Sequence, residues 1–305
     1  MADYGRMLAF GINVDPSAAG RAQAQELARR AEAAGLDFIG IQDHPYQPRF
    51  LDTWMLMATL LATTERIHVF PNVANLPLRG AAMIAKQAAS LDVLSGGRFE
   101  LALGAGAFWE AIAAMGGPVR RPGEAVTALE EAIRVIRLLW SDARTVSFDG
   151  RFYTLHGAHP GPPRVHPIGI WVGALKPRML RLTGRLADGW SVSLPYAPPE
   201  QLPAMQRLID EGAAAAGRQP QAIRRLYNLM GTITEGPAHR LLQGPVAHWV
   251  ETLTRFTVEL GLDTFIFWPE GDQIAQLERF AAAVVPGVRE AVARARWRPQ
   301  QEGER

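Results

Sequence analysis

Residues 67–103 read IHVFPNVANLPLRGAAMIAKQAASLDVLSGGRFELAL, and this stretch decides the fold. The apolar run at 67–70 predicts a strand, the longer segment at 81–94 predicts a helix, and the run at 99–103 predicts the next strand. Gly96 and Gly97 end the helix, because glycine is favoured just past a helix C-terminus. A helix that connects consecutive strands places them parallel in one sheet.

The same alternation continues in both directions and amounts to eight strand–helix pairs. We therefore predict an α/β fold, a (β/α)8 TIM barrel with insertion segments, in which eight parallel strands form the barrel. The alternative is an open doubly wound sheet with a second domain, but Gly104-Ala105-Gly106 lacks the third glycine of the dinucleotide fingerprint. The predicted strands span residues 8–14, 38–41, 67–70, 99–103, 168–172, 189–193, 226–233 and 264–268, and the predicted helices span 17–34, 51–63, 81–94, 122–140, 177–186, 199–216, 246–260 and 273–285.

One segment interrupts the alternation of strands and helices. Residues 144–167 contain four prolines and several glycines, which predict an irregular excursion rather than a linker between domains. We expect residues 1–290 to form a single barrel domain that includes this excursion. Residues 291–305 are predicted to form a polar C-terminal tail.

The composition excludes several classes of protein. The 305 residues include 32 basic and 30 acidic side chains, and a net charge of +2 argues against a dedicated nucleic-acid-binding protein. The sequence has no cysteine, which excludes disulfides, thiolate metal sites and a cysteine nucleophile. Lys86 and Lys176 are the two lysines, so Schiff-base chemistry has two candidates at most. Because no apolar run approaches the ~20 residues of a membrane span and no signal peptide is visible, we expect a cytoplasmic protein without a membrane partner.

Polar residues after the second predicted strand are the first candidates for catalysis. In a (β/α)8 barrel the active site lies at the carboxyl ends of the strands, and Asp43 and His44 follow residues 38–41. A histidine titrates near neutrality and can accept or donate a proton at a reacting atom. The alternative is a loop aspartate that caps a backbone amide beside a partly exposed histidine. His156 and His159 have no accompanying carboxylate pair, so we expect no metal site.

Three further strand ends carry residues suited to binding. The segment 173–176, Gly173-Ala174-Leu175-Lys176, leads into a helix whose free amides and dipole favour a phosphate, or it is a plain tight turn. The segment 104–106 leaves space for a flat ring, or for close helix–strand packing. Asn72 and Asn75 suit a ring edge that carries donors and acceptors, or they are local turn residues. Trp109 is placed to line a pocket.

Three longer stretches carry a family resemblance. They are GLDFIGIQDHPYQP at 35–48, PNVANLPLRGAAMIAKQAASLDVLSGGRFELALGAGAFWEAIAAMGG at 71–117 and IGIWVGALKPRMLRLTGRLADGW at 168–190. Together they resemble the luciferase-like monooxygenase superfamily, and within it the oxidoreductases that use the deazaflavin coenzyme F(420). The similarity runs from about Phe10 to about Phe280, and the Asp43-His44 pair is typical of the deazaflavin branch.

The resemblance implies hydride transfer between a small organic substrate and the deazaflavin, in a protein that forms a homodimer. It implies that His44 is the proton-transfer residue and that Asn72 and Val73 form a bulge, often with a non-prolyl cis peptide bond, that backs the ring. The remaining coenzyme contacts that it implies are Asp43 near the ring or ribityl chain, Asn75 at the ring edge, Gly104, Ala105 and Gly106 along the chain, and Gly173, Ala174, Leu175 and Lys176 at the phosphate.

The sequence also departs from this pattern. In the sugar-phosphate dehydrogenases of the group an acidic residue directly follows the glycine turn after the fourth strand, whereas here Ala107, Phe108 and Trp109 intervene before Glu110. The aromatic residue expected after the Asp43-His44 pair is replaced by Arg49 or displaced to Phe50. These departures argue against a sugar-phosphate substrate. The alternatives are an FMN-dependent monooxygenase that works with a partner reductase, an isomerase or lyase of phosphate ligands, and a non-catalytic flavin-binding homologue.

Overall fold

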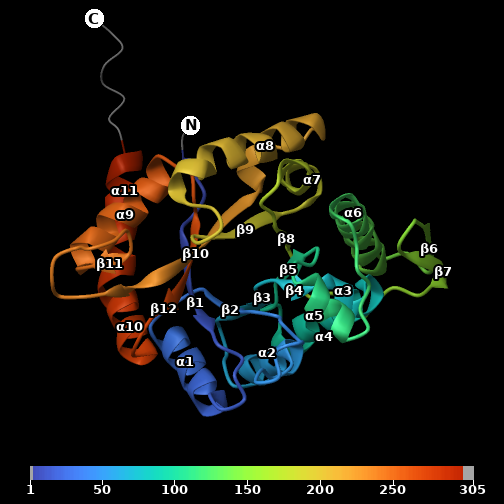
Figure 1. Ribbon diagram of the computed structural model, residues 1–305, viewed down its shortest axis with the longest axis horizontal. Coiled ribbons are helices and arrows are strands. Elements are labelled where there is room, and N and C mark those ends of the chain that lie inside the picture. The colour runs from blue at the N-terminus through green and yellow to red at the C-terminus, as the bar shows by residue number, and fades with distance from the viewer. Residues whose placement is uncertain (1–2, 298–305) are drawn as a thin grey trace, which may run out of the picture.

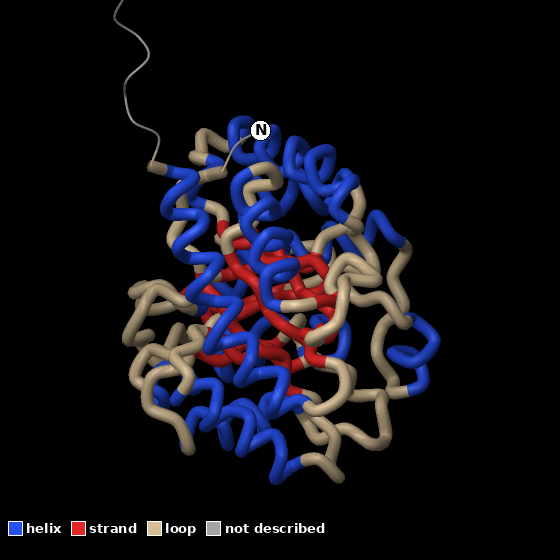
Figure 2. Tube along the Cα trace, turned by 90° about the vertical axis from the view of Figure 1, so that its left-hand side faces the viewer, coloured by secondary structure: helices blue, strands red, loops and turns tan. Residues whose placement is uncertain are grey.

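The computed structural model describes residues 3–297 and shows a parallel β-barrel surrounded by helices (Figure 1, Figure 2). Within these residues eight parallel strands form the wall, in the order β3-β2-β1-β12-β10-β9-β8-β5. A bridge between Val69 and Phe99 joins the first and last of them. The predicted fold is therefore confirmed. The wall strands are β1 (Ala9–Val14), β2 (Phe38–Ile41), β3 (His68–Pro71), β5 (Leu101–Gly104), β8 (Ile170–Gly173), β9 (Gly189–Ser193), β10 (Arg224–Ile233) and β12 (Thr264–Pro269), and the short strands β4 (Ala74–Asn75) and β11 (Gln243–Gly244) extend the sheet.

The helices form the outer layer and bury their apolar faces against the strands. Leu129, Ile133 and Ile136 of the fourth predicted helix are fully buried, as their spacing at steps of three and four indicates. The helices are α1 (Arg21–Ala33), α2 (Thr53–Ala62), α3 (Leu76–Arg79), α4 (Ala81–Ser95), α5 (Trp109–Ala114), α6 (Pro122–Leu139), α7 (Pro177–Leu186), α8 (Leu202–Ala215), α9 (Val246–Val258), α10 (Gln273–Arg279) and α11 (Val285–Arg296), with the short 3-10 helices η1 (Pro199–Gln201) and η2 (Pro220–Ala222) and the π-helical segment η3 (Phe280–Val284).

The inside of the barrel changes from apolar to polar along its axis. Phe38, Phe70 and Trp171 pack edge to face, with ring centroids 4.9–6.0 Å apart. Toward the carboxyl ends of the strands, the Asn72 amide donates to Asn228 Oδ1 at 2.6 Å, and Ser191 Oγ donates to Asn72 Oδ1 at 3.1 Å. The aromatic layer fills the barrel beneath the polar one, so a ligand has access from the carboxyl ends.

The excursion at 144–167 is more regular than we predicted. It contains an antiparallel hairpin of β6 (Val146–Asp149) and β7 (Thr154–Ala158), which projects outside α6 (Figure 1). Glu131 of α6 holds its turn, because its carboxylate accepts the backbone N–H groups of Arg151, Phe152 and Tyr153 at 2.8–3.2 Å. The proline-rich end that follows, residues 160–167, contains no regular element.

The C-terminal boundary also differs from the prediction. The chain continues from α10 through η3 into α11, which ends at Arg296, so residues 291–296 are helical rather than part of a tail. Val292 is only 1% exposed and fixes this last helix to the core. The rest of the predicted tail, residues 298–305, lies outside the described residues.

Two glycines allow α7 and α8 to approach closely, which positions the start of α7 at the barrel mouth. A Cβ atom on Gly184 would lie 1.9 Å from the Ile209 carbonyl oxygen, and one on Gly212 would lie 2.2 Å from the Arg181 carbonyl oxygen. Both obstacles are backbone atoms, so a side chain at either position would push the helices apart.

We expect Gly184→Ala to lower the free energy of unfolding by about 2 kcal/mol or more, because an added methyl group overpacks this crossing. Gly123→Ala is the matched control, since its Cβ would meet only the flexible end of Arg178 at 3.2 Å. Urea unfolding of both variants measures the difference. Equal midpoints for Gly184→Ala and the wild type would contradict the tight crossing.

Candidate active site

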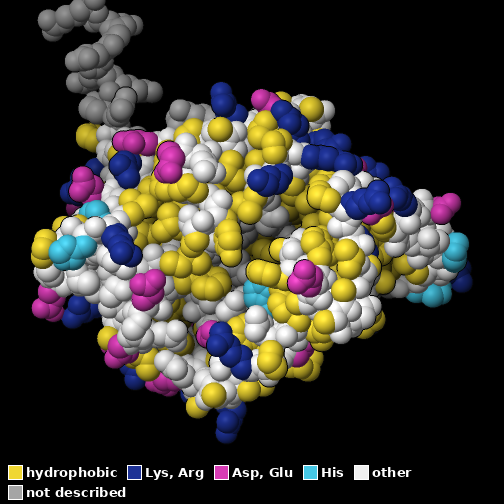
Figure 3. Space-filling view, viewed as in Figure 1, with side chains coloured by type: hydrophobic (Ala, Val, Ile, Leu, Met, Phe, Trp, Pro, Cys, Tyr) yellow, Lys and Arg dark blue, Asp and Glu magenta, His cyan; other side chains and the backbone are white. Residues whose placement is uncertain are grey.

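A pocket of about 380 Å³ opens at the carboxyl ends of β2, β4, β5 and β8. In the space-filling view the molecule is hollowed over the barrel strands, and hydrophobic side chains border much of the hollow (Figure 3). The pocket brings together ten of the twelve residues that the sequence analysis selected for catalysis or coenzyme binding, and Trp109 lines it as predicted. The ten are Asp43, His44, Val73, Asn75, Gly104, Ala105, Gly106, Gly173, Leu175 and Lys176, and residues not selected for the site, among them Tyr46, Phe108, Pro122, Val126 and Met179, also line it.

Asn72 and Ala174, the other two selected residues, lie behind the residues that line the pocket. The Asn72 carboxamide is engaged by Asn228 and Ser191 inside the barrel. Ala174 is 2% exposed, and its carbonyl oxygen accepts the indole N–H of Trp190 at 2.9 Å. Both residues therefore hold the wall in place instead of lining it.

Asp43 is buried and paired with an arginine that the sequence analysis missed. The Nε and one terminal nitrogen of Arg79 donate to the two carboxylate oxygens of Asp43, each at 2.7 Å, and the Asn75 backbone N–H adds a bond of 2.9 Å. Arg79 also donates to Asp52 at 2.7 Å, whose other oxygen caps the first turn of α2. This network joins the end of β2 to α2 and α3. A lone arginine in a four-residue helix gives no sequence signal for such a role.

His44 lies beside Tyr46 and Phe108. Its Nδ1 is 2.6 Å from the Tyr46 hydroxyl oxygen, and its ring centroid is 5.7 Å from that of Phe108. Burial lowers the pKa of His44, and the charge of Asp43 opposes this shift in part. Burial also raises the pKa of Tyr46 to about 12. Both side chains are therefore neutral at pH 7.

The Nδ1–hydroxyl contact suits both neutral tautomers of His44. With Nδ1–H donating to the Tyr46 oxygen, Nε2 carries a lone pair and accepts a proton. With the Tyr46 hydroxyl donating to Nδ1, Nε2 carries the proton and donates a hydrogen bond. A proton accepted at Nε2 of the first tautomer gives an imidazolium that keeps its Nδ1–H bond to Tyr46, so neutral His44 can act as a base and protonated His44 as an acid without losing this contact.

Val73 forms the floor between β3 and β5. The Asn72–Val73 peptide bond is cis, as the resemblance implies. A Cβ atom on Gly104 would lie 2.7 Å from a Val73 methyl group, and one on Gly173 would lie 3.3 Å from the same methyl group. A Cβ atom on Gly106, whose φ is 101°, would lie 2.7 Å from the ring of Trp109. Close contacts with Val73 and Trp109 therefore explain why these positions are glycines. Val73 itself faces the pocket.

The far end of the pocket is cationic. Lys176 precedes α7, whose first helical residue is Pro177, and its side chain is exposed. The helix N-terminus adds positive potential to the lysine charge. At the near end, Asn75 Oδ1 accepts the Leu78 N–H at 3.3 Å, so Asn75 serves as the local turn residue that the sequence left as an alternative.

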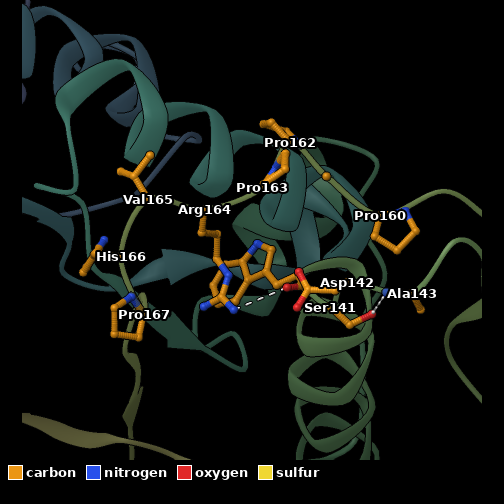
Figure 4. A pocket seen from close by; sticks show the side chains of 12 residues that line it. Ser141, Asp142, Ala143, Pro160, Pro162, Pro163, Arg164, Val165, His166 and Pro167 are labelled. Carbon is orange, nitrogen blue, oxygen red and sulfur yellow. Dashed lines mark hydrogen bonds between the residues drawn. The ribbon is translucent and has the colours of Figure 1, made fainter.

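A second pocket, of about 500 Å³, lies at the other end of the barrel. It is formed by the end of α6 and by residues 160–167, and Arg164 donates to the Trp140 carbonyl oxygen beside it (Figure 4). Because Pro167 precedes β8 whereas Lys176 follows it, this pocket is remote from the barrel mouth. The pocket that contains His44 is therefore the candidate active site.

Neither a metal cluster nor a membrane helix is present in residues 3–297. No three His, Asp or Glu side chains in this range are grouped so that they could hold a metal ion. The helices of the same range are too short or too polar to cross a bilayer. His159 uses its Nδ1 for a 3.0 Å contact with the Arg144 carbonyl oxygen in the hairpin region.

Comparisons with known proteins agree with this architecture. Residues 3–258 match the family model described as luciferase-like monooxygenase. An F(420)-dependent glucose-6-phosphate dehydrogenase of Kineococcus radiotolerans is 31% identical over 78% of this chain and 72% of its own length. An uncharacterised protein of Mycobacterium tuberculosis is 30% identical over 86% of this chain and 94% of its own. An F(420)-dependent secondary alcohol dehydrogenase, solved with an F(420)–acetone adduct, superimposes with a TM-score of 0.83 at 19% identity and covers 93% of this chain and 99% of its own.

We expect Asp43→Asn to lower the free energy of unfolding by about 3 kcal/mol, because it leaves the buried Arg79 guanidinium without its main counter-ion. The same change removes the charge that raises the pKa of His44, so this pKa should fall further. Urea unfolding and an NMR titration of His44 measure the two effects. Asp142→Asn, in an exposed loop, is the control. An unchanged His44 pKa would disprove the coupling to Asp43.

Proposed function

Because the chain belongs to the luciferase-like monooxygenase family, we propose that it is an oxidoreductase that transfers a hydride between a small organic substrate and the deazaflavin coenzyme F(420). One observation carries the proposal: a single pocket has a neutral histidine at one end and a lysine at a helix N-terminus at the other. The similarity to the F(420)-dependent dehydrogenase of Kineococcus radiotolerans supports the choice of coenzyme.

The pocket residues fit a flat ring attached to a phosphate-bearing chain. His44 follows β2 and Lys176 follows β8, three strands further round the barrel, which is roughly 14 Å along the wall at the usual strand spacing. Val73 lies between them, against Gly104 and Gly173, and offers an apolar surface for a ring. The amides after Gly173 and the Lys176 ammonium group would hold the phosphate.

His44 would move the proton that accompanies the redox step. The bound deazaflavin supplies the two-electron chemistry by exchanging a hydride with a substrate carbon. In oxidation, Nε2 of neutral His44 accepts the hydroxyl proton of an alcohol. In reduction, the protonated imidazolium form of His44 would return that proton from Nε2 to the substrate oxygen, and in both directions Nδ1–H donates to the Tyr46 hydroxyl oxygen.

Asp43 acts in this proposal as a positioning residue. Its bidentate pair with Arg79 fixes the loop that carries His44, and its charge keeps the pKa of His44 from falling further. Its hydrogen bonds go to Arg79 and Asn75, which supports a role in orienting the site rather than a direct coenzyme contact.

FMN has a flat ring and a phosphate as well, so the competing function is an FMN-dependent monooxygenase that works with a partner reductase. The same pocket would serve it. Coenzyme affinity separates the two functions, since only the true cofactor should bind tightly.

We further propose that residues 1–290 act as one domain and that two copies pair as a homodimer. Exposed apolar side chains on the neighbouring helices α2 and α4 support pairing, because apolar surface of this kind is stabilised when it is covered. Met55, Met83 and Leu94 are 62%, 56% and 82% exposed.

Lys176→Ala should weaken coenzyme binding about tenfold, which is the effect of losing one charge-assisted contact to a phosphate. Lys86→Ala is the control, because Lys86 lies on α4 and its ammonium group donates to the Gly161 carbonyl oxygen at 3.2 Å. Fluorescence titrations of the wild type with F(420) and with FMN complete the experiment. Tighter binding of FMN would favour the monooxygenase, and equal affinities of the two lysine variants would remove Lys176 from the site.

His44→Ala should lower turnover of alcohols by at least about a hundredfold while coenzyme affinity stays near the wild-type value. In the wild type, kcat/KM for oxidation should decline only below pH 6.5, because burial lowers the pKa of His44 from 6.5 and protonated His44 cannot accept a proton. Steady-state rates between pH 4.5 and pH 9 test both statements. Full turnover by His44→Ala with coenzyme bound would overturn the proton-transfer role.

A further inference from the structure

Phe108 is a large apolar side chain exposed at the entrance of the pocket. It is 53% exposed, although it lies directly before α5 and its neighbour Ile112 is fully buried. Its ring packs edge to face on His44 at 5.7 Å and on Tyr46 at 5.9 Å between centroids. Burying an exposed aromatic ring under a ligand is favourable, so this cluster is suited to bind apolar surface.

The charges around this cluster are balanced or distant. The Asp43 carboxylate is neutralised by Arg79. Among the described residues that line the pocket, Lys176 is the single lysine or arginine, and it lies at the far end, where the proposed function assigns it to a coenzyme phosphate. Glu110, two residues after Phe108, is exposed and is not among the residues that line the pocket.

A phosphorylated substrate would therefore find no compensating cation beside His44 within the described lining of the pocket. Moving a phosphate dianion from water to an apolar surface is costly unless it is paired. Phe108, His44 and Tyr46 instead offer ring surfaces and one imidazole nitrogen. An apolar body with a single hydroxyl or carbonyl oxygen matches these groups.

We propose that Phe108, with His44 and Tyr46, forms the substrate subsite, and that its substrate is an uncharged alcohol or carbonyl compound with a largely apolar body, not a sugar phosphate. The inference rests on the proposed function, because it assumes that the Lys176 end holds the coenzyme. It separates this chain from the glucose-6-phosphate dehydrogenase that it resembles. Phe108 is a specificity-determining residue in this account.

The test is equilibrium binding of two probes, 1-phenylethanol and glucose 6-phosphate, measured by calorimetry with and without F(420). We expect the coenzyme-bound protein to bind 1-phenylethanol more tightly than glucose 6-phosphate. Phe108→Ala should weaken 1-phenylethanol binding about tenfold, the usual worth of a lost aromatic contact, and leave coenzyme affinity unchanged. Met115→Ala, at an exposed position just after α5, is the matched control and should leave both affinities unchanged.

Two results would overturn the inference: tighter binding of glucose 6-phosphate, or 1-phenylethanol binding that Phe108→Ala leaves unchanged. Failure of the proposed function gives a different result, in which F(420) does not bind the wild type at all. The aromatic cluster is formed by protein side chains alone, so in that case the effect of Phe108→Ala on 1-phenylethanol binding to the free protein still decides the inference.

Discussion

The ion pair between Asp43 and Arg79 is the contact on which the geometry of the site depends. It brings the loop after β2 against the short helix α3 and, through Asp52, against the start of α2. The side chain of Asp43 is 1% exposed and that of Arg79 is 10% exposed, so the pair is largely shielded from water and its geometry is well defined. His44 follows Asp43 directly, and the position of its ring is therefore set by this buried pair.

The strand order then distributes the chemistry of the pocket. The loop after β2 supplies His44 and Tyr46, and the loop after β5 adds Phe108 to this neutral cluster, whereas the β8 end supplies Lys176 and the start of α7. Val73 lies between the two ends and separates them by an apolar floor. One end of the pocket is thus suited to proton transfer at an uncharged group and the other to a phosphate. This asymmetry connects the barrel topology to the proposed reaction.

The sequence correctly predicted those strands and helices whose bounds follow from a local pattern of apolar residues. The bounds of β2, α7 and β9 agree with the prediction, because each is a short apolar run or an amphipathic segment. The hairpin of β6 and β7 was missed, since its turn is held by Glu131 of α6, which lies about 20 positions away in the chain. Arg79 and Phe108 were missed as site residues because their contacts with Asp43 and His44 join separate loops, and no spacing pattern predicts them. Tyr46 was missed although it contacts His44 within the same loop, because no sequence pattern indicates that contact.

The central claim is that one coenzyme spans the pocket from His44 to Lys176. A crystal structure of the protein with oxidised F(420) tests it most directly. The account predicts that the deazaflavin ring lies on Val73 with its reactive carbon facing the substrate space beside His44, and that the phosphate contacts the amides after Gly173 and the Lys176 side chain. A phosphate bound away from the start of α7, or a ring that does not contact Val73, would contradict the account.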